Sequence, residues 1–263
     1  MRTTLLDIGG TFIKRSDGRQ FPISSDGSRE GIVAAIRKAI GPMKGLEGIG
    51  VAIPGPFDYE RGIFLMEHKF AAVKGEHFRE LAQVPAEIQL RFHHDVNSSL
   101  AGATRMMGLK NAALVTLGTG LGFAYAVDGK VQYNEKGSPA RNLWNLPCRG
   151  SILEDFVSAR GLRLAYARRT GNGYESALSI AQKAYAGDNS AQTVFQDMGA
   201  LLGEHLHRIR EEIPFTTLLM GGQVSKSLPL FLGRLEEALP GTDIRPVPEE
   251  AVFEGLASLF EYK

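Results

Sequence analysis

The chain has 263 residues, with 30 Lys and Arg residues against 29 Asp and Glu residues and a formal net charge of +1 at pH 7. This balance argues against a surface that follows nucleic-acid phosphates, because such a surface needs a clustered excess of Lys and Arg. Hydrophobic residues make up 43% and charged residues 22%, proportions that are typical of a folded chain and exclude a disordered one.

The first part of the chain predicts strands and helices in alternation. Leu5 and Leu6 lie in an apolar strand that leads through Gly9 and Gly10 into a second strand, which is the pattern of a β-hairpin. The elements expected next are a helix over 29–40, a buried strand over 48–53 that stops at Pro54-Gly55-Pro56, a short strand over 61–66, a short helix over 75–83, a strand over 86–92 and a helix over 97–107.

A second cycle of strand, glycine turn and strand follows. The strand over 112–117 ends in the turn Gly118–Gly122, the return strand covers 123–127, and Asp128-Gly129 is a type I′ hairpin signal. The remaining expected elements are an irregular loop over 134–150, helices over 152–169, 175–186, 190–212, 224–239 and 251–262, a strand over 215–220 and a turn at Gly221-Gly222. The alternation predicts an α/β protein with mixed sheets and a faint internal repeat.

The glycine-rich turns are candidate phosphate-binding loops. A turn without Cβ atoms presents successive backbone N–H groups that can bind phosphate oxygens. The first turn carries Asp7, whose carboxylate can hold the water shell of Mg²⁺, and Thr11, whose hydroxyl can donate to a phosphate. The second turn carries Thr119 and no carboxylate. Either turn alone is more simply an ordinary hairpin, but the third turn at Gly221-Gly222 favours the nucleotide interpretation.

Asp95 is the candidate catalytic carboxylate. It follows a predicted strand and precedes a predicted helix, which is where open α/β sheets place their ligands. There it could accept a proton from a hydroxyl whose oxygen attacks a γ-phosphate. Asp95 could also cap the helix that begins near Asn97, and the two roles do not exclude each other. The sequence does not separate the two roles.

Several other classes of protein are disfavoured. The chain has neither the Gly-x-Gly-x-x-Gly motif of Rossmann folds nor the Gly-x-x-x-x-Gly-Lys-Ser/Thr motif of P-loops. Cys148 is the only cysteine, so neither an intrachain disulfide nor a Cys-rich zinc site is expected. The first residues lack the apolar core of a signal peptide, and no apolar run of about 18 residues occurs. We therefore expect a cytoplasmic protein without membrane contact.

Five short motifs together resemble the ROK family of sugar kinases and sugar-responsive repressors. In chain order they are Asp7-Ile-Gly-Gly-Thr11, Ile53-Pro-Gly-Pro56, His94-Asp95-Val96-Asn97, Leu117-Gly-Thr-Gly120 and Gly221-Gly222. The resemblance implies an actin-like (ribonuclease H-like) ATPase fold, in which two α/β domains with mixed sheets lie around a central cleft. The implied domains are 1–104, joined by the closing helix at about 251–263, and 105–250.

The resemblance also implies roles for individual residues. Asp95 would be the base that activates a sugar hydroxyl, usually the one on C6, and His94, Glu154 and Gly55 would contact the sugar. Asp7 would hold Mg²⁺ through water. The residues implied in binding ATP are Asp7, Gly9, Gly10, Thr11, Lys14, Gly118, Thr119, Gly120, Gly221 and Gly222. Family members are often homodimers, and that state stays open for this chain.

The chain departs from the family pattern on the sugar side. The family usually has Asn before the catalytic Asp, where this chain has His94. The family also has a Glu-x-x-His segment and a Cys-rich zinc loop after the second turn. Here the segment reads Gly137-Ser-Pro-Ala-Arg-Asn-Leu-Trp144, so no zinc site is expected, and Glu154 corresponds to the family's glutamate after that loop.

The leading hypothesis is therefore an ATP-dependent kinase of a hexose-type sugar, glucose or a related one, that acts at O6. The first alternative is a ROK-type sugar-sensing regulator, which is disfavoured because only six residues precede Asp7, too few for a helix-turn-helix domain. Two others are a non-catalytic sugar- or nucleotide-binding protein and a kinase of another small hydroxylated metabolite.

Overall fold

In the computed structural model, which describes residues 1–261, strands β1 (Thr3–Ile8) and β2 (Phe12–Arg15) form the antiparallel hairpin that the sequence predicts. Their register pairs Ile8 with Ile13 and Asp7 with Lys14. The hairpin belongs to a five-stranded sheet of order β3-β2-β1-β4-β7, in which β1, β4 and β7 are parallel. The other strands are β3 (Gln20–Pro22), β4 (Gly48–Ile53) and β7 (Gln89–His94). The first sheet is therefore mixed, as expected.

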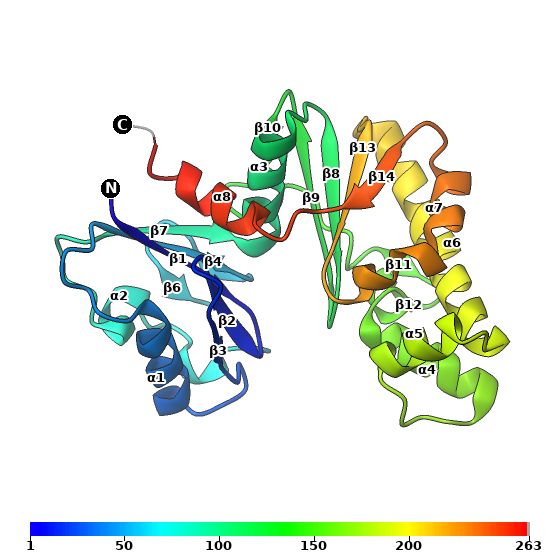
Figure 1. Cartoon of the computed structure of the whole chain (residues 1–263), viewed down its shortest axis with the longest axis horizontal. Helices are drawn as coiled ribbons and strands as arrows, with labels where there is room; N and C mark the ends of the chain where they lie inside the picture. Colours follow the sequence, from blue (N-terminus) through cyan, green and yellow to red (C-terminus); the bar gives the residue numbers. More distant parts are fainter. Residues whose placement is uncertain (262–263) are drawn as a thin grey trace. The chain divides into compact units, whose positions relative to one another are not determined.

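Helices cover both faces of this sheet (Figure 1). On one face, Leu6 and Ile8 of β1 share a core with α1 (Arg29–Ile40) and α2 (Phe78–Ala82). On the other face, Leu5 packs with residues of α8 (Ala251–Ser258). Because side chains alternate along a strand, Asp7 shares the face of Leu5. Short elements complete this region: β5 (Phe57–Asp58), β6 (Ile63–Phe64) and the 3₁₀ turn η1 (Ala71–Val73).

Helices α3 (Asp95–Met107) and α8 cross at an unusually short distance. A Cβ atom on Gly102 would lie 1.8 Å from the carbonyl oxygen of Ala251, and one on Gly255 would lie 2.0 Å from the carbonyl oxygen of Ser98. The Ser98 hydroxyl also donates a hydrogen bond of 2.9 Å to the carbonyl of Val252. Only glycine fits at both positions. The close contact with α8 therefore holds α3, the helix that begins at Asp95, in place.

The second sheet repeats the plan of the first. Its order is β10-β9-β8-β13-β14, with β9 antiparallel to β8 and with β8, β13 and β14 parallel. The strands are β8 (Ala112–Leu117), β9 (Leu121–Val127), β10 (Lys130–Val131), β13 (Thr217–Gly221) and β14 (Asp243–Pro246). Asp128 and Gly129 both have positive φ, as a type I′ turn requires. The internal repeat that the sequence suggests is thus present in the strand order.

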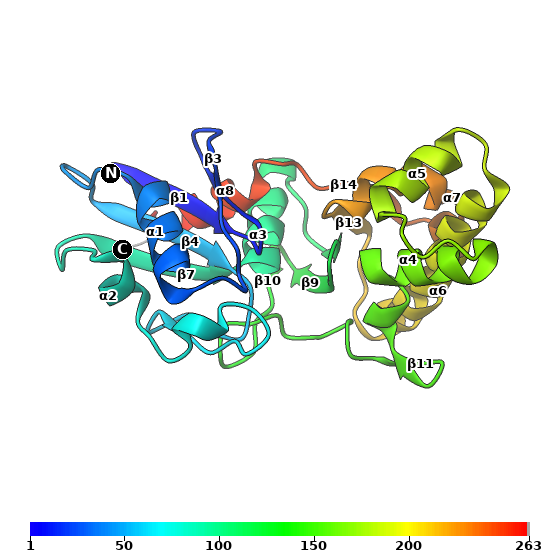
Figure 2. The same ribbon diagram turned by 90° about the horizontal axis from the view of Figure 1, so that it is seen from below.

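A helical layer packs on the second sheet (Figure 2). It contains α4 (Ala159–Thr170), α5 (Ala177–Tyr185), α6 (Asn189–Glu212), α7 (Leu232–Ala238) and the 3₁₀ segment η3 (Val224–Leu230). Among the described residues, no helix is both long enough and apolar enough to cross a membrane.

Three predicted helices are wrong in their extent. The helix expected over 152–169 begins only at Ala159, because a small hairpin of β11 (Pro147–Cys148) and β12 (Ser151–Ile152) and the 3₁₀ turn η2 (Leu153–Asp155) precede it. The helix expected over 224–239 is broken, since Pro229 cannot donate a helical hydrogen bond. The closing helix ends at Ser258, and its expected residues 262–263 lie outside the described part of the chain.

The chain divides into two compact units. The first comprises Met1–Gly108, Val131–Ala140 and the described residues from Pro248 onward, and the second comprises Leu109–Lys130 and Arg141–Val247. The division expected between residues 104 and 105 stays a prediction about domains. It did not anticipate that the segment 131–140 belongs with the first unit.

Candidate functional site

The first glycine turn is held by backbone hydrogen bonds at its two ends. The amide of Gly9 donates to the carbonyl of Phe12 at 3.0 Å, and the carbonyl of Gly10 accepts from the amide of Ser25 at 2.9 Å. Within residues 1–261 the amides of Gly10 and Thr11 have no acceptor. Two adjacent N–H groups are therefore free to bind an anion, whereas the amide of Gly9, which was expected to join them, is already bonded.

Asp95 lies where the sequence predicts, at the junction of β7 and α3. Its Oδ1 is 2.8 Å from Nδ1 of His94 and accepts a hydrogen bond of 2.7 Å from the amide of Val96. No residue among those described donates a hydrogen bond to its Oδ2, and the side chain is 36% exposed. Helix α3 begins at Asp95, with His94 as the preceding cap residue. His94 therefore holds the cap position, while the side chain of Asp95 accepts the hydrogen bond from the amide of Val96 in the first turn of α3.

Asp7 and Asp95 are coupled electrostatically. Burial is the largest cause that raises the pKa of Asp7, and the negative charge of Asp95 adds to it. The charge of Lys14, whose Nζ lies 4.0 Å from Oδ2, opposes both, so the pKa of Asp7 lies at about 6. Burial also acts to raise the pKa of Asp95, but the imidazole of His94, the amide of Val96 and the charge of Lys69 outweigh it, so this pKa lies below its usual value. Of the two carboxylates, Asp95 is the stronger acid and is ionised at neutral pH.

Tyr59 is a site residue that sequence reasoning missed. Its hydroxyl donates to the carbonyl of Ile53 at 3.2 Å, and its ring lies 5.9 Å from the imidazole of His94. Gly55 leaves room for this contact, because a Cβ there would lie 3.3 Å from the Tyr59 hydroxyl and 3.6 Å from Nε2 of His94. Burial and the charge of Asp95 raise the pKa of Tyr59 against a hydrogen bond from Ser138. Tyr59 therefore stays neutral.

The segment 131–140 contacts this group from a distant part of the sequence. Tyr133 shares a hydrogen bond of 3.1 Å with Nε2 of His93, and Asn97 donates to the carbonyl of Gly137 at 3.3 Å. Burial and the neighbouring His94 lower the pKa of His93 to about 4, so His93 is neutral. Gly137 has a positive φ of 75°, so a glycine in this polar loop was a sequence signal for the sharp turn of the segment.

The second glycine turn has a similar pair of free amides. The amide of Gly118 donates to the carbonyl of Gly120 at 3.0 Å, whereas those of Thr119 and Gly120 have no acceptor in the described chain. Glu154, expected to contact a sugar, accepts a hydrogen bond of 2.8 Å from the amide of Leu121. A Cβ on Gly120 would lie 2.7 Å from the Glu154 carboxylate, so this glycine makes the contact possible.

The third turn packs against the end of β8. Gly222 has a φ of 84°, and a Cβ there would lie 2.3 Å from the carbonyl oxygen of Leu117. A Cβ on Gly221 would lie 3.2 Å from the Thr116 side chain. Packing against β8 therefore explains why both positions are glycine. Their expected contact with ATP stays a prediction. The second unit brings the second and third turns together.

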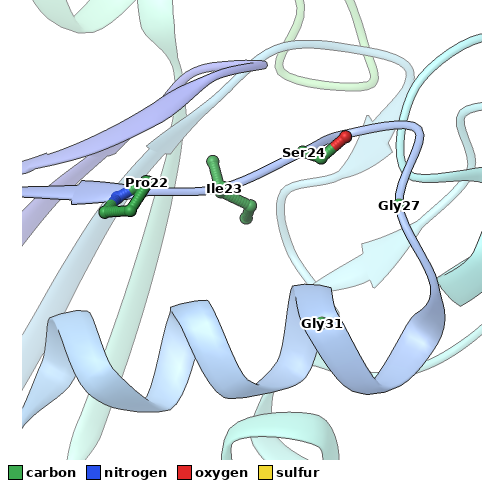
Figure 3. Close-up of a pocket in the computed structure, with 5 residues that line it drawn as sticks. All are labelled: Pro22, Ile23, Ser24, Gly27 and Gly31. Carbon is green, nitrogen blue, oxygen red and sulfur yellow. The ribbon is translucent and has the colours of Figure 1, made fainter.

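A surface pocket of about 340 Å³ lies between β3 and the first turn of α1 (Figure 3). Its lining residues are Pro22, Ile23, Ser24, Gly27 and Gly31. None of the expected site residues lines it, and it contains no titratable side chain. This pocket is therefore separate from the candidate site residues.

The residues at the candidate site suit a magnesium ion, whereas the described residues offer no set of zinc ligands. Asp7 is 22% exposed beside the free amides of the first turn, and one carboxylate with water is a common way to hold Mg²⁺ next to phosphates. In contrast, Cys148 is buried, and the described residues contain no group of three His, Cys, Asp or Glu side chains placed to hold a metal. Zinc has no ligand set within residues 1–261.

A comparison with protein families assigns the chain. The model of the ROK family matches residues 4–142, more than half of the sequence. The chain belongs to the ROK family. A comparison with curated proteins gave no sequence match.

Solved structures of other ROK proteins share the fold. The chain is similar to the ROK family glucokinase from Streptomyces griseus in complex with glucose and AMPPNP, at 21% identity and a TM-score of 0.81 over 98% of both chains. It is similar to the ROK hexokinase from Thermus thermophilus, at 20% identity and a TM-score of 0.71 over 98% of this chain and 97% of that one. It is also similar to a ROK family transcriptional regulator, a homolog of the E. coli MLC protein, at 16% identity and a TM-score of 0.76 over 98% of this chain and 81% of that one.

The ROK assignment and these structures confirm the expected fold, an actin-like α/β fold with two mixed sheets. Around the β11–β12 hairpin, Leu143, Cys148 and Leu153 join the core of the second unit. Within the first unit, the structure brings Asp7, His94 and Asp95 to one end of the parallel strands. The roles of these residues in binding and catalysis stay predictions.

Proposed function

We propose that this ROK protein is an ATP-dependent sugar kinase that transfers the γ-phosphoryl group to a hydroxyl of a hexose. The observation that carries the proposal is Asp95, an ionised carboxylate with one oxygen held by His94 and Val96 and the other free. The ROK glucokinase from Streptomyces griseus, solved with glucose and AMPPNP, has the same fold and supports this substrate class.

The proposed reaction needs a base but no covalent enzyme intermediate. Oδ2 of Asp95 accepts the proton of the sugar hydroxyl while the hydroxyl oxygen forms a bond to the γ-phosphorus. The bond from that phosphorus to the oxygen of the β-phosphate breaks, and ADP leaves with the electron pair. Glucose or a related hexose, phosphorylated at O6, is the proposed acceptor.

We assign the phosphates to the glycine turns. The free amides of Gly10 and Thr11, and those of Thr119 and Gly120, would donate to phosphate oxygens, with Lys14 adding positive charge. Mg²⁺ held by Asp7 through water would neutralise charge that develops on the phosphates. In this proposal Gly9, Gly118, Gly221 and Gly222 shape the nucleotide site, while Gly55 and Glu154 contact the sugar and His94 lies beside the base on the sugar side.

A sugar-sensing regulator is the second candidate. The similarity to a ROK family transcriptional regulator favours it, because the two chains share a fold over 98% of this one. A regulator of this kind could bind sugar without phosphorylating it.

A panel of hexoses tests the two candidates. ADP release is measured for each sugar with ATP and Mg²⁺, and a direct binding assay follows for every sugar that gives no turnover. Sugar-dependent ADP release supports the kinase. Sugar binding without ADP release from any hexose, under conditions in which the protein is folded, contradicts it and favours the regulator.

A further inference from the structure

The ring of His94 makes two contacts through one nitrogen. Nδ1 lies 2.8 Å from Oδ1 of Asp95 and 3.3 Å from the amide nitrogen of Val96. The first contact needs a proton on Nδ1, because a bare nitrogen and a carboxylate oxygen would repel each other at this distance. The second contact, as a hydrogen bond, needs Nδ1 without a proton.

The geometry decides between these contacts. A distance of 2.8 Å is normal for an N–H group that donates to a carboxylate, whereas 3.3 Å is long for any hydrogen bond. The amide of Val96 also has a better acceptor, since it lies 2.7 Å from Oδ1 of Asp95. Every donor is satisfied when Nδ1 carries the proton, and none of the short contacts is then repulsive.

The surroundings of His94 keep its ring in this orientation. The side chain is only 15% exposed, and the ring lies against that of Tyr59 at 5.9 Å between centroids. Tyr59 is itself tied to the carbonyl of Ile53 at 3.2 Å. The ring therefore has little freedom to turn away from Asp95.

We propose that His94 is a positioning residue, which donates a hydrogen bond from Nδ1 to Oδ1 of Asp95 and so directs Oδ2 toward the acceptor hydroxyl. This inference rests on the proposed kinase function and deepens it, because His94 was expected only to contact the sugar. Two donors, the imidazole and the amide of Val96, hold one oxygen of Asp95 and leave the other as the base. A catalytic base that is aimed in this way loses little orientational freedom when the sugar binds.

Substitution of His94 by residues with amide side chains distinguishes the roles of its two ring nitrogens. The amide nitrogen of Asn can occupy the position of Nδ1, and that of Gln can occupy the position of Nε2, so each replacement keeps one donor position. We expect His94→Asn to keep kcat within about threefold of wild type, because it still donates to Asp95. We expect His94→Gln and His94→Ala to lower kcat by roughly 10- to 100-fold, with the KM for sugar changed less than threefold.

The kinetic result that overturns the proposal is specific. If kcat is retained in all three variants and the KM for sugar rises, His94 is a sugar ligand and not a positioning residue. If His94→Asn is as slow as His94→Ala, the donor at the Nδ1 position is not what matters, and the proposal also fails. Circular dichroism and thermal melting of each variant show that the comparison is made between folded proteins.

A measurement without substrate tests the same hydrogen bond. Long-range ¹⁵N–¹H NMR correlation of the labelled wild-type protein reports which ring nitrogen of each histidine carries a proton, and the His94 signals are those absent from His94→Asn. A proton on Nδ1 is expected, and a bare Nδ1 overturns the proposal. If wild type phosphorylates no sugar, the proposed function fails, and this spectrum still decides whether His94 donates to Asp95.

Discussion

The crossing of α3 and α8 leads to a stability prediction for Gly102→Ala. A Cβ at this position would lie 1.8 Å from the carbonyl oxygen of Ala251 and 2.8 Å from the backbone nitrogen of Gly255. These are backbone atoms of a neighbouring helix, so they cannot move aside as a flexible side chain could. The two helices would have to separate by roughly 1.5 Å to restore normal contact distances.

The expected cost follows from that separation. Overpacking of a close interface costs about 1–3 kcal/mol, and the strained hydrogen bond from Ser98 to Val252 adds about 1 kcal/mol. Alanine is a better helix former than glycine by about 1 kcal/mol, which offsets part of the loss. We therefore expect Gly102→Ala to lower the free energy of unfolding by about 1–3 kcal/mol.

Urea denaturation followed by circular dichroism measures this effect. With a slope of about 3 kcal/mol per M for a chain of this size, the unfolding midpoint should fall by roughly 0.3–1 M. Gly233→Ala in α7 is the matched control, because a Cβ there has no heavy atom within 4 Å, and it should be neutral or slightly stabilising. A Gly102→Ala protein as stable as the control would refute the argument that backbone contact dictates glycine at this crossing.

The remaining predictions concern the candidate site. Asp95→Asn should lower sugar-dependent ADP release by roughly 10²- to 10⁴-fold and leave ATP affinity unchanged by calorimetry, whereas Asp197→Asn at an exposed position of α6 should change neither quantity; a fast Asp95→Asn enzyme excludes Asp95 as the base. The pKa of Asp7 is raised from 3.8 to about 6, so the folded state resists its ionisation and wild type should lose stability as the pH rises from about 4 to about 6. Asp7→Asn removes this loss and should be more stable than wild type at pH 7 by about 3 kcal/mol in urea melts, unlike the exposed control Asp26→Asn; equal pH profiles would contradict the raised pKa. Glu154→Ala should weaken both sugar and ATP affinity by roughly 5- to 20-fold, because the sugar side loses a carboxylate and Leu121 in the second turn loses its acceptor, while Glu154→Gln can still accept that bond and should keep ATP affinity near wild type; unchanged sugar affinity in both variants would exclude Glu154 from the sugar side.

Local patterns in the sequence determined much of the fold. The helix at 29–40 and the strands at 48–53 and 112–117 have the predicted limits, because the apolar spacing and the turn residues that bound them lie within a few residues of each other. The position of Asp95 at a strand end follows from the same local signals.

Other features depend on residues that are far apart in the chain, and only the tertiary structure decided them. The predicted helix over 152–169 was wrong at its start, because Leu153 is drawn into the core and Glu154 accepts from Leu121 across the second turn. No local pattern could place Gly137 beside Asn97, or show that Gly102 must be glycine because Ala251 lies against it. Hydrogen bonds and steric contacts of this kind act between segments that meet only after folding, so the arrangement of Tyr59, His94 and Asp95 is a property of the folded chain and not of any one motif.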